Sequence, residues 1–330
     1  METRILGGSG LTVSAIGLGC NNFGARIDLE QSRKVVARAL DLGVTFFDTA
    51  DVYGVHWGSQ AGRSGLSEDY LGQSLGERRK DVVICTKFGL PFDGDATRKG
   101  GSRRHIMRSV EESLKRLRTD WIDLYQIHRP DLSTPIEETL RALDDLVRQG
   151  KVRYIGCSGF AAWRLVEAQW TARHNGLNRF VALEDEYSLL SREIERDLIP
   201  LLGSYGLSLL PYYPLAAGML TGKYQRNTPQ PKGSRFANTA SLGDRFGSDA
   251  TWEKVEKLGD FASARGHTLL ELAMSWLVRR PAVASVIAGA TSPEQIEQNV
   301  AAANWVLSEA ELAEIDTIVP PGQGGGGGRY

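Results

Sequence analysis

Residues 45–54 read TFFDTADVYG, residues 82–89 read VVICTKFG and residues 122–131 read IDLYQIHRPD. Each stretch begins with a continuous apolar run, which is typical of a strand buried on both faces. Each run then ends in polar residues. Amphipathic stretches separate the runs. The three stretches therefore predict parallel strands joined by helices, with polar side chains where the strands end.

The same alternation extends over most of the chain. Apolar residues three and four apart predict helices at Leu29–Leu42, Arg103–Leu117 and Ile136–Gln149. The expected strands are Ala15–Cys20, Thr45–Ala50, Val82–Gly89, Ile122–His128, Val152–Gly159, Phe180–Ser188, Leu207–Pro214 and Val283–Ala290. Eight such strands alternating with helices predict an α/β chain folded as a (β/α)8 TIM barrel with further helices at its C-terminal end. An open doubly wound sheet is the rival arrangement.

We expect a single domain over residues 1–320, because no Pro- or Ser-rich linker divides the chain at its middle. The segment from Ala216 to Ala250, after the seventh strand, is rich in Gly, Pro, Ser and Asn. A loop of that length in a compact domain is usually functional. Residues 321–330 include GQGGGGG and are expected to form a flexible tail.

The composition excludes some classes of function. The chain is 42% hydrophobic and 24% charged with a net charge of −1, so nothing in it favours nucleic acid or an anionic membrane as a partner. Cys20, Cys85 and Cys157 each lie in an apolar run and are expected to be buried thiols rather than metal ligands. No targeting segment or membrane-spanning run is present, which predicts a cytoplasmic protein. The oligomeric state is left open.

The usual phosphate-binding motifs are absent. The segment Gly17-Leu18-Gly19-Cys20-Asn21-Asn22 lacks the third glycine of GxGxxG, and Tyr224 follows Gly222-Lys223 where a Walker motif needs Ser or Thr. A dinucleotide would therefore have to bind by another device.

Four polar residues lie at the ends of three adjacent strands. Asp48 and Tyr53 follow the second strand, Lys87 lies within the third, and His128 ends the fourth. Each has an ordinary structural interpretation, although lysine rarely enters a buried strand unpaired. Because barrel chemistry occurs at the C-terminal ends of the strands, the four together predict a catalytic set.

Their chemistry suits carbonyl reduction, which needs hydride at carbon and a proton for the developing alkoxide. A phenol is a poor donor at neutral pH unless its anion is stabilised. We expect Lys87 to lower the pKa of Tyr53, Asp48 to hold Lys87, and His128 to orient the carbonyl. The rival is a lyase in which Lys87, free of Asp48, forms a Schiff base.

The chain resembles the aldo-keto reductases over almost its whole length. The matching segments are GLGCNNFG, FDTADVYG, TKFG, DLYQIHRPD, GKVRYIGCSGF, EYSLLSR, PYYPLAAGMLTGKY and AGATSPEQIEQN. The resemblance implies a barrel that binds NADPH, or NADH, in an extended pose. It also implies that Tyr53 is the acid, Lys87 and Asp48 its tuning pair, and His128 the orienting residue. Relatives that reduce an enone C=C often carry Glu in place of His128, so an aldehyde, ketone or keto-sugar is favoured.

The resemblance also implies a cofactor site. Ser158 falls at the nicotinamide carboxamide and Tyr212 where an aromatic ring stacks on the nicotinamide. The loop over the pyrophosphate and the helix at the adenosine end contain the other implied residues, Leu215, Gly218, Leu220, Lys223, Gln295, Gln298 and Asn299.

Two residues depart from the family pattern at the nicotinamide. Gly159 replaces the usual Asn, and Glu184 replaces the usual Gln. A carboxylate can accept a hydrogen bond from the carboxamide but cannot donate one, and its charge favours the oxidised ring. We expect both residues to contact the cofactor and the binding to be weaker than usual.

The segment expected to bind the 2′-phosphate also lacks positively charged residues. Gly289, Thr291 and Gln295 supply no charge, so a preference for NADPH depends on Lys223 or on an arginine of the 216–250 segment. On the substrate side, we expect Trp57 and His56 to wall the site beside His128.

One alternative of another class remains. Potassium-channel β subunits are barrels of this family that bind nicotinamide and regulate a partner, and they retain the four polar residues. A further alternative keeps the reductase chemistry within a deoxysugar or secondary-metabolite pathway.

Overall fold

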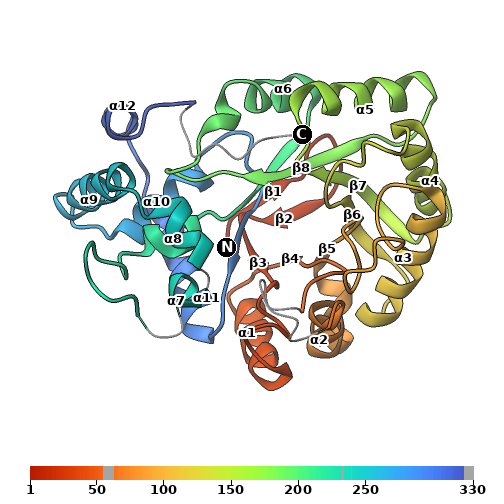
Figure 1. The fold of residues 1–330 in the computed structure, drawn as a ribbon, viewed down its shortest axis with the longest axis horizontal. Helices are drawn as coiled ribbons and strands as arrows, with labels where there is room; N and C mark the ends of the chain where they lie inside the picture. The colour runs from red at the N-terminus through yellow and green to blue at the C-terminus, as the bar shows by residue number, and fades with distance from the viewer. Residues whose placement is uncertain (55–62, 232–233, 239, 323–330) are drawn as a thin grey trace.

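The structure is a computed structural model that describes residues 1–54, 63–231, 234–238 and 240–322. Within these residues, eight parallel strands lie side by side in the order β10-β3-β4-β5-β6-β7-β8-β9, with helices outside them (Figure 1). The strands are β3 Ile16–Gly19, β4 Phe46–Asp48, β5 Val83–Phe88, β6 Ile122–Ile127, β7 Val152–Ser158, β8 Phe180–Glu186, β9 Ser208–Tyr212 and β10 Val286–Gly289.

The two outer strands of this order meet and nearly close the ring. Leu209 of β9 forms a parallel bridge with Val283, just before β10. The backbone N–H of Leu209 donates to Ala282 O at 2.7 Å, and that of Ala284 donates to Leu209 O at 3.0 Å. The expected (β/α)8 barrel is therefore confirmed, and the open doubly wound sheet is excluded.

All eight expected strands are present, although each is shorter than the apolar run that predicted it. Every residue of β5 and of β6 is buried, as expected for strands with the barrel interior on one face and helices on the other. The difference in length is largest at the eighth strand, where only Val286–Gly289 of the predicted run Val283–Ala290 forms a β-strand.

Helices cover the outside of the barrel, and the three expected helices are found within one residue of their predicted ends. The α-helices are α1 Leu29–Asp41, α2 Leu66–Leu75, α3 Arg103–Leu117, α4 Ile136–Arg148, α5 Ala162–His174, α6 Leu198–Tyr205, α7 Arg235–Asn238, α8 Ala240–Phe246, α9 Asp249–Ser263, α10 Leu269–Val278, α11 Pro293–Ala301 and α12 Glu309–Ile318. The 3₁₀ turns are η1 Gly76–Asp81, η2 Glu193–Glu195, η3 Ala216–Thr221 and η4 Ala302–Asn304. The long segment after β9 thus contains η3, α7 and α8.

A hairpin that the sequence analysis missed closes the N-terminal end of the barrel. It consists of β1 Thr3–Ile5 and β2 Thr12–Ser14, paired antiparallel. Leu6 and Val13 beside it are fully buried, in a cluster with residues from the starts of the barrel strands. Gly7 has φ +54°, and a Cβ there would lie 2.1 Å from the Val181 carbonyl oxygen, so the hairpin fits only with glycine at this point.

No helix among the described residues is long and apolar enough to cross a membrane. The expected glycine-rich tail falls almost wholly on residues 323–330, which lie outside the described residues.

Candidate active site

Five of the expected site residues lie at the C-terminal rim of the barrel because each ends a strand or directly follows one. Asp48 is the last residue of β4, Ser158 of β7 and Tyr212 of β9. His128 follows β6, and Lys87 is the last residue but one of β5. Parallel strands bring these ends to one rim, where barrel chemistry occurs.

Lys87 points into the barrel and is fully buried. Its Nζ donates to Asp48 Oδ1 at 2.5 Å and to the Thr49 carbonyl oxygen at 3.0 Å. The ammonium group is therefore held from β4, as expected for a paired lysine inside a strand.

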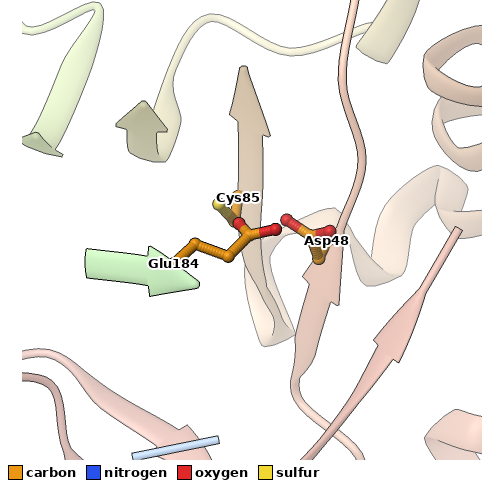
Figure 2. Close-up of side chains that lie close together, drawn as sticks. All are labelled: Asp48, Cys85 and Glu184. Carbon is orange, nitrogen blue, oxygen red and sulfur yellow. The ribbon is translucent and has the colours of Figure 1, made fainter. Parts of the chain in front are cut away.

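Glu184 of β8 supplies a second carboxylate to the same ammonium. Its Oε2 lies 3.1 Å from Lys87 Nζ and accepts a hydrogen bond from Gln126 Nε2 at 2.7 Å. Figure 2 shows the carboxylates of Asp48 and Glu184 directed toward one another, with Cys85 beside them. Such a donor set resembles a metal site, but here the ammonium of Lys87 is the cation that the two carboxylates share.

These charges shift one another's protonation. Burial alone would lower the pKa of Lys87, but Asp48 and Glu184 outweigh it and hold that pKa well above its usual value. Burial, followed by the charge of Asp48, raises the pKa of Glu184 to about 8. Lys87 is therefore charged throughout the working pH range.

Tyr53 and His128 lie over this charged group at the rim. The rings of Tyr53 and His128 meet edge to face, with centroids 5.6 Å apart and planes at 81°. Lys87 Nζ lies 5.3 Å from the centroid of the Tyr53 ring. The structure thus brings together all four residues of the predicted catalytic set.

The pKa of Tyr53 differs from the expectation. Burial raises it, and although Lys87 acts in the lowering sense, Asp48 and Glu184 add to the increase, so the pKa lies above its usual value. The phenol therefore keeps its proton at neutral pH. Lys87 can still stabilise the Tyr53 phenolate. That phenolate forms only when an acceptor such as a substrate alkoxide takes the proton.

His128 is buried, and its pKa is well below the usual value, first because of burial and then because of the charges of Lys87 and Arg129. It is therefore neutral near pH 7. A neutral imidazole can donate one hydrogen bond to a carbonyl oxygen without adding a positive charge.

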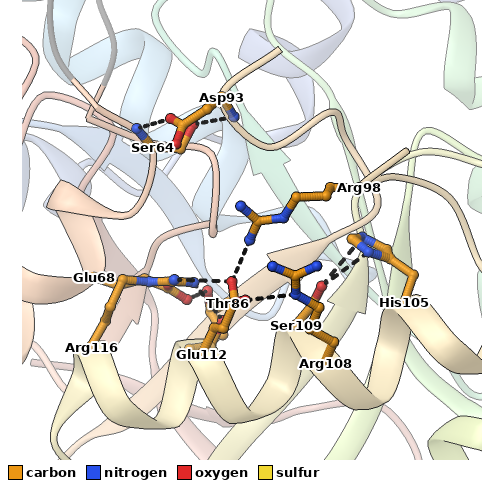
Figure 3. Close-up of polar contacts among 11 residues, drawn as sticks. Ser64, Glu68, Thr86, Asp93, Arg98, His105, Arg108, Ser109, Glu112 and Arg116 are labelled. Carbon is orange, nitrogen blue, oxygen red and sulfur yellow. Dashed lines mark hydrogen bonds and ion pairs between the residues drawn. The ribbon is translucent and has the colours of Figure 1, made fainter. Parts of the chain in front are cut away.

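A polar network behind the site connects β5, the strand of Lys87, to two helices outside the barrel (Figure 3). Glu68 of α2 is fully buried and accepts from Thr86 Oγ1 at 2.6 Å and from Arg116 Nε of α3 at 2.7 Å. Thr86 precedes Lys87 on β5. The network therefore connects α2, β5 and α3 and limits the movement of β5.

A cavity of about 780 Å³ extends from the predicted catalytic residues toward α11. The expected site residues that line it are Asp48, Tyr53, His128, Ser158, Glu184, Tyr212, Leu215, Gly218, Lys223, Gln295, Gln298 and Asn299. A volume of this size is typical of a site for a cofactor-sized ligand.

Three of the expected residues that the structure describes do not line this cavity. Lys87 lies behind Asp48 and Tyr53, and Leu220 is fully buried in the core. Gly159 adopts φ +65° and faces the side chain of Arg129. Trp57, like His56, lies outside the described residues.

The loop after β9 has an unusual backbone. Tyr213, Ala216 and Ala217 have positive φ values of 51°, 45° and 57°. Gly218 follows at φ 103°, and a Cβ there would lie 3.0 Å from Lys223 Nζ. Non-glycine residues at positive φ cost of the order of 1–3 kcal/mol each and gather at ligand clamps. This supports a binding role for the loop.

Three arginines that the sequence analysis did not name line the cavity, and one of them lies in the 216–250 segment, where an arginine was expected. Arg26 lies in the loop after β3, Arg129 directly follows His128, and Arg235 is the first residue of α7. The Arg129 guanidinium forms a hydrogen bond with the Tyr212 hydroxyl. For Arg129, the only signal in the sequence was its position one residue beyond a catalytic candidate.

Gly159 and Arg129 fit together, which leads to a first prediction. A Cβ at residue 159 would lie 2.2 Å from Arg129 Nη1, so Gly159→Ala must move the guanidinium and also strain the backbone. We expect the free energy of unfolding to fall by more than the roughly 1–2 kcal/mol of left-handed strain alone, and the affinity for NADPH to change as well. Chemical denaturation and a fluorescence titration measure the two effects.

Gly176→Ala is the matched control, because Gly176 has φ +63° and nothing within 4 Å of its Cβ position. This variant has the same backbone strain of a positive φ but no steric clash with a neighbouring side chain. Equal losses of stability in the two variants would show that Arg129 does not depend on Gly159.

Comparisons with known proteins agree with this geometry. The model described as the aldo/keto reductase family matches residues 15–320. A probable voltage-gated potassium channel subunit beta of Oryza sativa subsp. japonica is 38% identical over 328 residues, covering 97% of each chain. The uncharacterized oxidoreductase YrpG of Bacillus subtilis (strain 168) is 37% identical, covering 98% of each. L-glyceraldehyde 3-phosphate reductase of Escherichia coli (strain K12) is 34% identical, covering 98% of this chain and 94% of that protein.

Proposed function

The chain belongs to the aldo/keto reductase family of NAD(P)H-dependent oxidoreductases, and we propose that it reduces the carbonyl group of a small aldehyde, ketone or keto-sugar with NADPH, using Tyr53 as the general acid. One observation carries the proposal. The Tyr53 ring lies close to both the imidazole of His128 and the buried ammonium of Lys87, and it lines a cavity of about 780 Å³.

The residues at the nicotinamide end have distinct roles in this proposal. Bound NADPH would supply the hydride. A ring N–H of His128, which lies beside the Tyr53 ring, donates to the substrate carbonyl oxygen and holds it near the Tyr53 hydroxyl. Tyr53 then gives its proton to that oxygen as negative charge develops, and Lys87 stabilises the phenolate left behind. Asp48 keeps Lys87 charged and directed toward the ring.

The far end of the cavity suits an anionic group. Arg26 and Arg235 both line it, and the pKa of Arg26 is lowered by burial and then by the charge of Arg235, so the two guanidinium groups are close enough to repel each other. A bound phosphate would relieve that repulsion. Arg235 Nη2 lies 3.5 Å from the Cβ position of Gly289, beside Gln295. This arginine of the 216–250 segment supplies the charge that the GATSPEQ segment lacks.

We therefore expect Arg235→Leu to weaken NADPH binding more than NADH binding. A charge-assisted hydrogen bond contributes about 1.5–3 kcal/mol, so the Kd of NADPH should rise about 10–100-fold. The Kd of NADH, which lacks the 2′-phosphate, should change by much less. Fluorescence titration of both cofactors measures this. Arg173→Leu, which removes an arginine stacked on Trp170 of α5, controls for the loss of charge. Equal weakening for the two cofactors would place Arg235 elsewhere than at the 2′-phosphate.

The Schiff-base lyase is disfavoured by the placement of Lys87. That mechanism needs an uncharged amine that a substrate carbonyl can reach. Lys87 is instead fully buried and bonded to Asp48, and its pKa is raised.

A regulatory barrel is the second candidate, because the similarity to potassium channel β subunits covers nearly the whole chain. A catalytic and a regulatory protein share the same four polar residues, so turnover must separate them. NADPH oxidation should be followed with a panel of aldehydes, ketones and keto-sugars, with Tyr53→Phe as the control. Turnover well above the control supports the reductase. NADPH binding with no turnover on any carbonyl would overturn it in favour of the regulatory barrel.

A further inference from the structure

The ammonium of Lys87 is shared between two carboxylates, and only Asp48 is used in the mechanism above. The second carboxylate, Glu184, has a fixed place. Its Oε2 is 3.1 Å from Lys87 Nζ and 2.7 Å from Gln126 Nε2, and its side chain is 2% exposed. Gln126 in turn donates to Cys85 Sγ at 3.0 Å. Contacts with residues of β5 and β6 thus fix the carboxylate of Glu184, which cannot rotate freely into the cofactor cavity.

The charges in this cluster do not balance. One ammonium faces two carboxylates, which leaves a net negative charge in the barrel interior if both are ionised. The ligand atoms of Asp48, Cys85 and Glu184 lie within 4.8 Å of one another. Like charges this close, with little water to screen them, favour a state in which one of the two acids keeps a proton.

The groups that face Glu184 support this assignment. They are Asp48 from β4, Cys85 and Lys87 from β5, Gln126 from β6, Ser158 paired in register on β7, and Tyr53 above them. Lys87 is the one cation among these described neighbours, and Asp48 takes its shorter bond, at 2.5 Å against 3.1 Å. Burial and the charge of Asp48 raise the pKa of Glu184 to about 8. The proton therefore belongs on Glu184 rather than on Asp48.

We propose that Glu184 is a positioning residue for Lys87 that carries a proton in the working enzyme, and that its ionisation at alkaline pH turns the site from one suited to reduction into one that holds the oxidised cofactor. The first half of this proposal, the positioning of Lys87 in the working enzyme, rests on the proposed function. With Glu184 neutral, the cluster of Asp48, Lys87 and Glu184 carries no net charge, and Lys87 can stabilise the Tyr53 phenolate. With Glu184 ionised, a negative charge faces both Tyr53 and a nicotinamide ring beside Ser158.

The proton balance keeps Glu184 out of the chemical step. In reduction the O–H bond of Tyr53 breaks and an O–H bond forms on the substrate oxygen, while the bonding pair stays on the phenolate. Solvent restores the proton to Tyr53 after turnover. Glu184 keeps its own proton throughout and acts only through Lys87.

The first test compares pH profiles of wild type and Glu184→Gln for kcat/KM of carbonyl reduction. An acid whose pKa is raised in the folded protein is protonated below that value and ionised above it. Wild-type reduction should therefore fall above about pH 8. Glu184→Gln cannot ionise, so its profile should lack this fall, whatever its absolute rate. The same alkaline fall in both proteins would overturn the proposal.

The second test measures binding and needs no turnover. Between about pH 6.5 and 9.5, wild type should shift its preference toward NADP⁺ over NADPH by about tenfold, because a new negative charge then faces the cationic ring. The ratio of the two Kd values should stay constant in Glu184→Gln. This arm separates the two proposals. A pH-dependent ratio without carbonyl turnover refutes the reductase and keeps the inference, whereas turnover with a constant wild-type ratio refutes the inference.

A third measurement uses wild type alone, in case the variant does not fold. Infrared difference spectra of the protein labelled with ¹³C-glutamate, recorded across the same pH range, should show a protonated glutamic acid band at neutral pH that disappears at alkaline pH. Absence of that band at neutral pH would refute the proposal.

Discussion

Tyr53→Phe will lower kcat for carbonyl reduction by about 10²–10⁴-fold, the usual contribution of a positioned acid. The substitution removes one hydroxyl and leaves the ring in contact with His128 and close to Lys87. Without the hydroxyl, the developing alkoxide has no proton donor, because Lys87 is buried behind the ring and His128 is neutral with a lowered pKa. Single-turnover NADPH oxidation measures the loss.

The same variant should bind NADPH as wild type does, within about twofold, since the loss is expected only in the transition state. Tyr154→Phe provides a matched control, because Tyr154 lies on β7 against the cluster at the opposite end of the barrel and should retain activity. Full activity in Tyr53→Phe would assign the acid to another residue.

Lys87→Met will lower both the turnover and the free energy of unfolding. Methionine has a similar length but no charge, so Asp48 and Glu184 lose the ammonium that they share. Removing one partner from a buried ion pair typically costs about 3–5 kcal/mol. We expect a loss of this order near pH 8, measured by chemical denaturation, together with a loss of turnover at least as large as that of Tyr53→Phe.

The stability loss should depend on pH. In Lys87→Met both carboxyl groups are buried without a cation, so their folded-state pKa values lie above those of the unfolded chain. The folded variant then binds more protons than the unfolded chain, and its stability falls as the pH rises above about 4. The deficit relative to wild type should therefore shrink on acidification.

A triple variant is the control for this prediction. Lys87→Met with Asp48→Asn and Glu184→Gln removes the unpaired charges along with the cation, and such neutral replacements are often tolerated. It should recover most of the lost stability without recovering activity. A single variant Lys87→Met as stable as wild type at pH 8 would show that the cluster is not a structural element.

The barrel strands could be predicted because burial on both faces leaves continuous apolar runs, such as the six residues of β5. The hairpin β1–β2 could not, because its strands have three residues each, which is shorter than the 4–8 residues on which strand patterns rest. The only signal was the turn sequence Gly7-Gly8-Ser9-Gly10 between them.

The four polar residues of the site could also be predicted, since each lies at or near a strand end. The contact of Glu184 with Lys87 could not, because it depends on how β8 and β5 face each other once the ring is closed. The pKa of Tyr53 depends on burial that no sequence pattern reports. Arg129 reaches its place because Gly159, which directly follows β7, has no side chain.

The hairpin at the N-terminal end has a consequence for how this protein can change. Leu6 and Val13 pack near Val83, the first residue of β5, whereas Lys87 lies four residues further along, roughly 13 Å away. Substitutions that far apart usually act independently. Substitutions at the hairpin can therefore raise thermal stability without lowering turnover. Substitutions at the opposite end can change substrate specificity without lowering the free energy of unfolding.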